Sequence, residues 1–185
     1  MVWQITEPLT FFLEKIVSPI DTSLSQERQL TKACSRFLIN LIFEQTVDHC
    51  LQYTHKGKPL LNSLNAQISI SHCKEWVAVY IDRSDSDESI GIDIEGQRNK
   101  LIEMSKKFVG PKDFDPQNNP ESALLIWSSK EVLYKIYAEK SLDFKTHLSV
   151  QIQPQLAGII TIDDYYKLVA LDHQMIEDKL MVWSL

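Results

Sequence analysis

The feature that most constrains the fold of this chain is a polar stretch at residues 82–89, almost midway along its 185 residues. It contains only charged residues and serines, so it has no apolar face to bury and is predicted to be a linker. A linker at this place predicts two lobes, residues 1–85 and residues 86–185. The chain is 44% hydrophobic, as in ordinary globular proteins, so each lobe can form a small core.

The first lobe is predicted to contain one long amphipathic helix. Ser23 and Gln26 have the spacing of a capping box at its start. Apolar residues then recur three and four positions apart, as on the buried face of a helix, at Leu30, Ala33, Cys34, Phe37, Leu38 and Leu41. Cys34 lies in this stripe and is therefore predicted to be a small buried residue rather than a reactive thiol.

Strands are predicted in both lobes. A turn is expected at residues 57–59, and the patterns at 66–71 and 76–81 predict two neighbouring strands. In the second lobe, short β-rich segments recur at residues 148–152, 158–162, 168–171 and 180–183. Since helices and mostly antiparallel strands occur in each lobe, the fold class is predicted to be α+β.

The second lobe is also predicted to contain two helices, a short one at residues 101–108 and a long one at about 121–139. Asn119 is placed to cap the long helix, with Pro120 at its first position. Its inner face is expected to carry Ala123, Trp127, Tyr134 and Ile136.

Composition excludes several classes of protein. The chain has 19 Lys and Arg against 25 Asp and Glu, a formal charge of −6, which argues against a nucleic-acid-binding protein. Three cysteines without CxxC spacing argue against a disulfide framework and a zinc site. The longest uninterrupted apolar run, residues 123–127, falls far short of the roughly 20 residues that cross a bilayer. The N-terminus lacks the features of a signal peptide, and we expect a cytoplasmic protein.

Two carboxylates, Asp93 and Glu95, share one face of a predicted strand, and the alternating isoleucines of that strand are expected to face a core. Gly91 on the carboxylate face lets a ligand or another backbone approach. Two like charges on one face repel each other unless a cation lies between them, so a hard divalent metal is a candidate occupant. The alternative is a solvated strand face without chemical function.

Further polar residues have the chemistry of phosphate binding. Glu131 and Lys135 share a face of the long helix, either as a surface ion pair or as a metal ligand and a phosphate-binding ammonium. Ser71 and His72 end a predicted strand, and with Lys58 in the preceding turn they can donate hydrogen bonds to a phosphate. The alternative for His72 is a packed or surface histidine.

These motifs together resemble those of the 4′-phosphopantetheinyl transferases, more closely the two-lobed type that activates non-ribosomal peptide and fatty-acid carrier proteins. In chain order they are Gly57-Lys58-Pro59, Ile70-Ser71-His72, Gly91-Ile92-Asp93-Ile94-Glu95 and Trp127-Ser128-Ser129-Lys130-Glu131 with Lys135. The pair of a GxDxE and a WxxKExxxK motif is specific, although either motif alone is weak. The resemblance implies two similar lobes related by pseudo-twofold symmetry, each a small, mostly antiparallel sheet packed with helices. It also implies a monomer with coenzyme A in the cleft between them.

The reaction implied by the resemblance moves the phosphopantetheine arm of coenzyme A onto a serine of an acyl or peptidyl carrier protein and releases 3′,5′-ADP. It serves fatty-acid, polyketide or non-ribosomal peptide biosynthesis. The implied ligands of Mg²⁺ are Asp93, Glu95 and Glu131. The implied contacts to the phosphates and nucleotide of coenzyme A come from Lys58, Ser71, His72, Arg36, Lys130, Lys135 and Lys140. Asp113 is the candidate for the general base.

The sequence also allows two alternative functions and predicts one partner surface. A catalytically inactive relative would bind coenzyme A or a carrier protein without transfer, and a metal-dependent nuclease built on the same carboxylates is disfavoured by the acidic composition. Carrier proteins of the family are usually acidic. A basic stretch offers them a docking surface, because five cations oppose Glu103 alone, and 5 − 1 gives +4. These cations are Arg98, Lys100, Lys106, Lys107 and Lys112.

Overall fold

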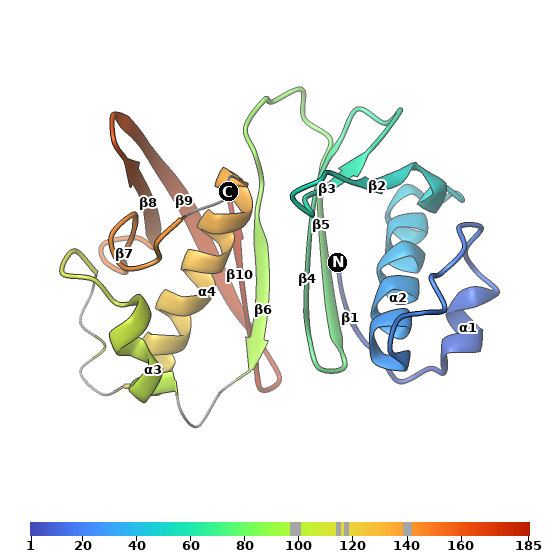
Figure 1. Ribbon diagram of the computed structural model, residues 1–185, viewed down its shortest axis with the longest axis horizontal. Helices are drawn as coiled ribbons and strands as arrows, with labels where there is room; N and C mark the ends of the chain where they lie inside the picture. Colours follow the sequence, from blue (N-terminus) through green and yellow to red (C-terminus); the bar gives the residue numbers. More distant parts are fainter. Residues whose placement is uncertain (97–100, 114–115, 117–118, 139–141) are drawn as a thin grey trace. The chain divides into compact units, whose positions relative to one another are not determined.

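The computed structural model of the chain describes residues 1–96, 101–113, 116, 119–138 and 142–185. Contacts divide it into two compact units, Met1–Asp87 and Glu88–Leu185, with the division inside the polar stretch described above (Figure 1). All the strand pairings that the structure describes are antiparallel. Helices pack on the sheets, so the protein is α+β, as predicted.

The first unit packs α2 against a three-stranded sheet of order β1-β5-β4, with α1 packed on α2, and β2 and β3 form a separate ladder. Its elements are β1 (Val2–Gln4), α1 (Leu9–Leu13), α2 (Gln26–Phe43), the 3₁₀ helix η1 (Asp48–Cys50), β2 (Leu51–Tyr53), β3 (Pro59–Leu61), β4 (Gln67–Cys73) and β5 (Trp76–Asp82). The two predicted strands of this unit are confirmed as β4 and β5, which pair along their whole length.

Helix α2 begins later than its sequence pattern predicted. Its N-cap is Ser25, whose hydroxyl accepts a hydrogen bond from the Arg28 N–H at 3.5 Å. Ser23 lies outside the helix, where its N–H and hydroxyl both donate to Asp21, at 2.9 and 2.7 Å. Cys34 is fully buried in the core beneath α2, as predicted. Its burial raises the pKa of the thiol to about 12.

The second unit has a five-stranded sheet of order β6-β10-β9-β8-β7, with α4 lying across it and α3 packed on α4 (Figure 1). Its elements are β6 (Ile92–Gly96), α3 (Leu101–Phe108), α4 (Pro120–Tyr137), β7 (Leu148–Gln151), β8 (Ala157–Ile162), β9 (Tyr165–Ile176) and β10 (Lys179–Ser184). The predicted cap is confirmed, because Asn119 Oδ1 accepts a hydrogen bond from the Glu121 N–H at 2.9 Å.

The buried surface of α4 is wider than the predicted stripe. Ala123 and Ile136 are buried as expected, but Tyr134 is 38% exposed and packs its ring against Phe144, 5.7 Å between centroids. Since the sheet covers one side of α4 and α3 packs on another, polar residues such as Lys130 are fully buried as well. Within the described ranges, neither α4 nor any other helix is long and apolar enough to cross a membrane.

Candidate functional site

Strand β6 turns its two carboxylates toward the core beneath α4. Asp93 pairs with Val182 and Glu95 with Leu180 in the β6–β10 ladder, and directly opposed residues of antiparallel strands share a face. Both partners belong to the apolar core that α4 covers. The isoleucines of β6 are buried as expected, with Ile92 and Ile94 4% and 1% exposed, but the carboxylates lie on the side of the strand that α4 covers. Asp93 and Glu95 are 6% and 8% exposed.

Gly91 allows β6 and α4 to approach each other closely. A Cβ atom placed on Gly91 would lie 2.7 Å from the Val132 carbonyl oxygen and 3.1 Å from Ile136 Cγ1, both too short for unstrained contact. The sequence left open whether a ligand or a backbone approaches this glycine, and the structure places the backbone of α4 there. Two motifs far apart in the sequence thus lie against each other.

Lys135 and Asp93 join these two motifs through an ion pair. The Lys135 Nζ atom lies 3.0 Å from Asp93 Oδ1 and also donates to the Ile92 carbonyl oxygen at 2.7 Å. The side chain of Asp93 is nearly inaccessible to solvent and that of Lys135 is a quarter exposed. The ammonium therefore neutralises a carboxylate that the resemblance assigns to the metal.

The carboxylate oxygens beside Lys135 are of the ligand type that a hard divalent cation prefers. Asp93 and Glu95 present carboxylate oxygens on one strand face, and Glu131, half-buried, lies one helical turn before Lys135 on α4. Mg²⁺ commonly uses one or two protein carboxylates, with water and substrate phosphates as the other ligands. Among the described residues, however, no group of three or more His, Cys, Asp or Glu side chains is gathered that could hold a metal ion.

Lys130 lies in the interior of the second unit. Its fully buried Nζ donates to the carbonyl oxygens of Phe108, Phe144 and Leu148 at 2.7–2.8 Å and to Asp113 Oδ2 at 2.6 Å. Desolvation lowers the pKa of Lys130, and the hydrogen bond and charge of Asp113 oppose that shift. Four acceptors surround an ammonium that has three protons, which argues against the predicted role of Lys130 in binding the cofactor.

Asp113 is equally enclosed. Its side chain is inaccessible to solvent, and besides Lys130 it accepts hydrogen bonds from the N–H groups of Gly110 and Val150 at 2.6 and 2.7 Å. The loop is tightly packed here, since a Cβ atom on Gly110 would lie 2.1 Å from the Lys145 carbonyl oxygen. Because an ammonium and two backbone N–H groups occupy its oxygens inside the fold, this carboxylate does not reach a substrate. The predicted general base is thus corrected to a structural residue.

The residues implied for the 3′-phosphate lie in the first unit, around neighbouring strands. Ser71 pairs with Ala78 and His72 with Val77 in the β4–β5 ladder, so their side chains are on opposite faces of the sheet. Ser71 is buried and His72 is exposed. Lys58, half-buried, directly precedes β3, which contacts β4. The fold brings the three residues to one pair of neighbouring strands but does not place Ser71 and His72 on a common face.

Arg36 anchors the segment that precedes α2. Its Nη1 donates to the Pro19 carbonyl oxygen at 2.6 Å. The pKa of Tyr53 is raised by desolvation, and the charge of Arg36 partly offsets that shift. One guanidinium N–H group is therefore engaged within the fold. Lys140 and Arg98 lie outside the described residues.

Sequence reasoning missed a polar network in the first unit. Asp48 is fully buried and accepts hydrogen bonds from Asn40 Nδ2 at 2.9 Å and from the N–H groups of Ser18 at 2.8 Å and Val17 at 3.2 Å. Asn40 Oδ1 in turn accepts from the N–H groups of Val47 and Asp48 at 2.7 and 2.8 Å. The available signal was Asn40 itself, a polar residue three positions after the apolar Phe37 in the helix stripe.

Comparisons with known proteins add no assignment to this arrangement. No protein-family model and no curated protein matches the chain.

Proposed function

We propose that the chain is a 4′-phosphopantetheinyl transferase, which moves the phosphopantetheine arm of coenzyme A onto a serine of a carrier protein. The observation that carries this proposal is the contact between its two motifs, with Gly91 against Val132 and Lys135 bonded to Asp93. Carboxylates and an ammonium from separate motifs thereby lie together in a partly buried place. Transfer of a group from a pyrophosphate needs such an arrangement, because charge builds up on the phosphate oxygens.

The reaction replaces the phosphoanhydride bond of coenzyme A by a phosphate ester bond to serine. The serine oxygen attacks the phosphorus that bears the pantetheine arm, and the bond from that phosphorus to 3′,5′-ADP breaks. Mg²⁺, when bound by Asp93 and Glu95, supplies positive charge at the pyrophosphate. Lys135 donates a hydrogen bond to a pyrophosphate oxygen. Glu131 is more exposed than the two strand carboxylates. We assign to it the role of general base, which accepts the proton of the serine hydroxyl.

The first unit supplies the other contacts of the proposal. Lys58 and His72 bind the 3′-phosphate and Arg36 binds the nucleotide end, whereas Ser71, buried on the face of β4 opposite His72, is not assigned a phosphate contact. Each unit packs an 18-residue helix, α2 or α4, against an antiparallel sheet, which supports the idea that they are the two similar lobes of a pseudo-twofold fold. We expect a cytoplasmic monomer.

Mass spectrometry of an apo carrier protein after incubation with coenzyme A and Mg²⁺ tests the proposal. One phosphopantetheine should be added per carrier. Asp93→Ala and Glu131→Ala should each slow the transfer by about 100-fold or more. Glu121→Ala is the matched control, since Glu121 is an exposed carboxylate in the first turn of the same helix. Undiminished transfer by either site variant would refute the assignment.

Removal of the metal gives a second test of the same site. Chelation of divalent cations should abolish transfer, and added Mg²⁺ should restore it, because two nearby carboxylates need a cation to hold a pyrophosphate. Thermal unfolding in the presence and absence of the chelator controls for a loss of structure. Transfer that persists in excess chelator would exclude the metal from the reaction.

A second candidate is a catalytically inactive relative that binds coenzyme A or a carrier protein. It is favoured by the ion pair that already neutralises Asp93 and by the finding that no three-ligand metal group forms among the described residues. Calorimetry that detects coenzyme A binding, together with no transfer to any carrier protein tested, would select this candidate over the first.

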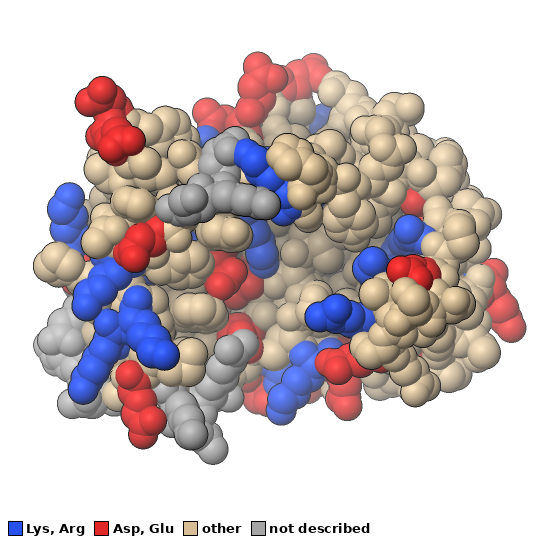
Figure 2. Space-filling model, viewed as in Figure 1, with Lys and Arg blue, Asp and Glu red and all other residues tan. Residues whose placement is uncertain are grey.

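The proposed partner is an acidic carrier protein that docks on the basic stretch after β6. In its described part, Lys106, Lys107 and Lys112 are exposed and Glu103 is the acidic neighbour. Figure 2 shows Lys and Arg side chains gathered at the lower left of the view, over α3. An overall charge of −6 does not prevent docking on such a surface, because screening limits the distant charges.

A further inference from the structure

Both strand carboxylates of β6 are bonded to groups of the chain itself. Asp93 Oδ1 lies 3.0 Å from Lys135 Nζ, and Glu95 Oε1 accepts a hydrogen bond from the Gly96 N–H at 3.0 Å. Lys135 Nζ also donates to the carbonyl oxygen of Ile92 at 2.7 Å. A divalent cation that binds these carboxylates must therefore compete with donors that the protein supplies.

Charge opposes the binding of a divalent cation alone. Mg²⁺ lies about 2.0–2.1 Å from its oxygen ligands. On Asp93 Oδ1 it would lie within about 5 Å of the Lys135 ammonium, where like charges repel each other. Asp93, Glu95 and Lys135 together carry −2 + 1, or −1, and a dication alone would change this total to +1. The ion pair thus weakens the affinity of the carboxylates for a free metal ion.

Charge equally opposes the binding of a pyrophosphate alone. A pyrophosphate diester carries a negative charge on each phosphate, so it would change the same total to −1 − 2, or −3. With cation and pyrophosphate together the total returns to −1. Lys135 can serve both states, because its side chain is a quarter exposed and its flexible stem can turn the ammonium from Asp93 to an incoming anion. Each ligand thus removes the repulsion that the other one meets.

We infer that the ion pair of Lys135 and Asp93 couples the two ligands. Lys135 holds Asp93 until a pyrophosphate takes the ammonium, so cation and pyrophosphate bind together and neither binds tightly alone. By linkage, each raises the affinity for the other by the same factor. The identification of the pyrophosphate as that of coenzyme A rests on the proposed function. On this inference the ion pair belongs to the ligand-free protein and does not by itself distinguish an enzyme from an inactive relative.

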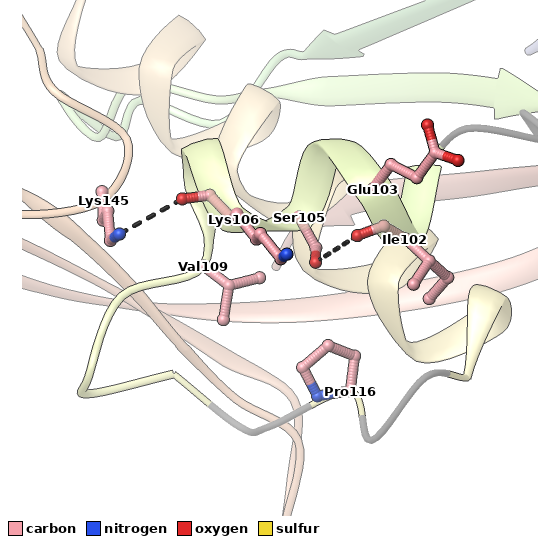
Figure 3. A pocket seen from close by; sticks show the side chains of 7 residues that line it. All are labelled: Ile102, Glu103, Ser105, Lys106, Val109, Pro116 and Lys145. Atoms are coloured by element: carbon pink, nitrogen blue, oxygen red, sulfur yellow. Dashed lines mark hydrogen bonds between the residues drawn. The ribbon is translucent and has the colours of Figure 1, made fainter.

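A pocket of about 490 Å³ beside α3 is a competing place for an anion (Figure 3). Its charged lining comes from Lys106, Lys145 and Glu103, which sum to 2 − 1, or +1. A single carboxylate beside two ammonium groups does not attract a dication. An anion bound in this pocket would therefore not raise the affinity for a metal ion, and coupling between the two ligands distinguishes the carboxylates of β6 from the pocket.

The test measures the affinity for Mn²⁺, which binds oxygen ligands as Mg²⁺ does and gives an electron paramagnetic resonance signal when free. Titrations are made with and without coenzyme A, in the absence of a carrier protein, and coenzyme A without protein gives the blank. Wild type should bind Mn²⁺ at least about tenfold more tightly with coenzyme A. Lys135→Met should bind Mn²⁺ alone about tenfold more tightly than wild type, and coenzyme A should improve this affinity less than about threefold.

Two controls separate the ion pair from general effects of charge. Lys167→Met removes an ammonium of matched exposure, 24% against 25% for Lys135, from the ion pair with Glu88 in the same unit. Lys145→Met removes an ammonium of the pocket. Both variants should keep the coupling of wild type. Circular dichroism checks the fold, and Lys135→Gln, which keeps a hydrogen-bond donor without its charge, repeats the test if Lys135→Met unfolds.

The outcomes separate the inference from the proposed function. Equal affinity of wild type for Mn²⁺ with and without coenzyme A, or no binding in either state, would overturn the inference even if transfer occurs. Wild-type coupling in the Lys135 variants, or its loss in Lys145→Met, would also overturn it. If the coupling is found and depends on Lys135 but no carrier protein is modified, the inference holds and the proposed function fails.

Discussion

Asp48 is a buried carboxylate of the first unit that is held by hydrogen bonds. Burial acts to raise the pKa of Asp48, but hydrogen bonds from Asn40, Ser18 and Val17 outweigh burial, and the net pKa is lowered. A folded-state pKa below the unfolded value gives stability that is fully present above about pH 4. This stability is lost as the pH falls through the folded-state pKa. We expect Asp48→Asn to reduce the free energy of unfolding near neutral pH by about 1–3 kcal/mol. The variant should not show the further fall in stability that protonation of Asp48 causes in wild type at low pH.

Urea unfolding of wild type and Asp48→Asn at about pH 7 and about pH 3 measures this effect. Asp87→Asn is the control, because Asp87 is exposed. The difference between wild type and Asp48→Asn should shrink on acidification. A constant difference at both pH values would show that the charge of Asp48 does not stabilise the fold.

The buried pair of Lys130 and Asp113 leads to a second prediction at the residue scale. Lys130→Met leaves the Asp113 carboxylate buried without its cation, and we expect a loss of about 3–5 kcal/mol in the free energy of unfolding. Lys107→Met changes an exposed lysine on α3 and should cost little. The double variant Lys130→Met with Asp113→Leu should lose less free energy of unfolding than the two single variants lose in sum. Additive losses in chemical denaturation would contradict coupling within the pair.

The same pair shows where sequence reasoning stops at the scale of single residues. The motif containing Lys130 indicates a residue type at a position, but it carries no information on burial. Asp113 lies 17 residues earlier, and only the folded loop after α3 brings its carboxylate to the ammonium. Asp93 and Lys135 were predicted as site residues from strand and helix periodicity, and the structure does bring them together. Periodicity determines which residues share a face of β6 or of α4, but it does not indicate that these two faces meet.

At the scale of elements, the spacing of β6 and α4 depends on Gly91. We expect Gly91→Ala to push the strand away from the helix and to cost about 1–3 kcal/mol. It should also slow the proposed transfer, because Lys135 and Asp93 bridge the same two elements. Gly96→Ala is a matched control in β6, since its Cβ atom would meet only the flexible side chain of Lys179, at 3.3 Å or more. Thermal unfolding and transfer rates of the two variants test this, and equal behaviour would contradict it.

Elements with strong local signals were predicted well and weak ones were not. Helix α4 has a capping residue, a proline at its first position and a long apolar pattern, and its start was predicted correctly. Strand β9 is 12 residues long, because it pairs with both β8 and β10, but only residues 168–171 were recognised. The three-residue strand β1 was missed, because its extended conformation depends on pairing with β5 and not on a pattern in its own sequence.

At the scale of the whole molecule, charge predicts how salt should act on the proposed transfer. The net charge of −6 repels an acidic carrier, whereas the lysines around α3 attract it. The Debye length is about 10 Å at 0.1 M salt, so nearby charges act more strongly than distant ones. We therefore expect kcat/KM for the carrier to fall between about 50 and about 300 mM salt, with coenzyme A saturating. A rise with salt would show that overall repulsion controls the encounter.

The division of the chain is the large-scale feature that the sequence indicated most directly. Eight polar residues in a row cannot contribute to a core, and the structure divides the chain within them, after Asp87. Each unit has its own apolar cluster. The sequence could not indicate that both β6 carboxylates face the helix-covered core, because a strand pattern shows two faces without showing which one a helix covers.

The burial of Lys130 has a practical consequence. Amine-acylating reagents act on accessible, deprotonated lysines, and the Lys130 ammonium is enclosed by four acceptors. It should remain unmodified in the native protein and react only when the second unit opens. Cys34, fully buried and with its pKa raised to about 12, should behave in the same way toward thiol reagents in the first unit. Each unit of the chain therefore carries a chemical reporter of unfolding, and mass spectrometry can follow both in a single time course.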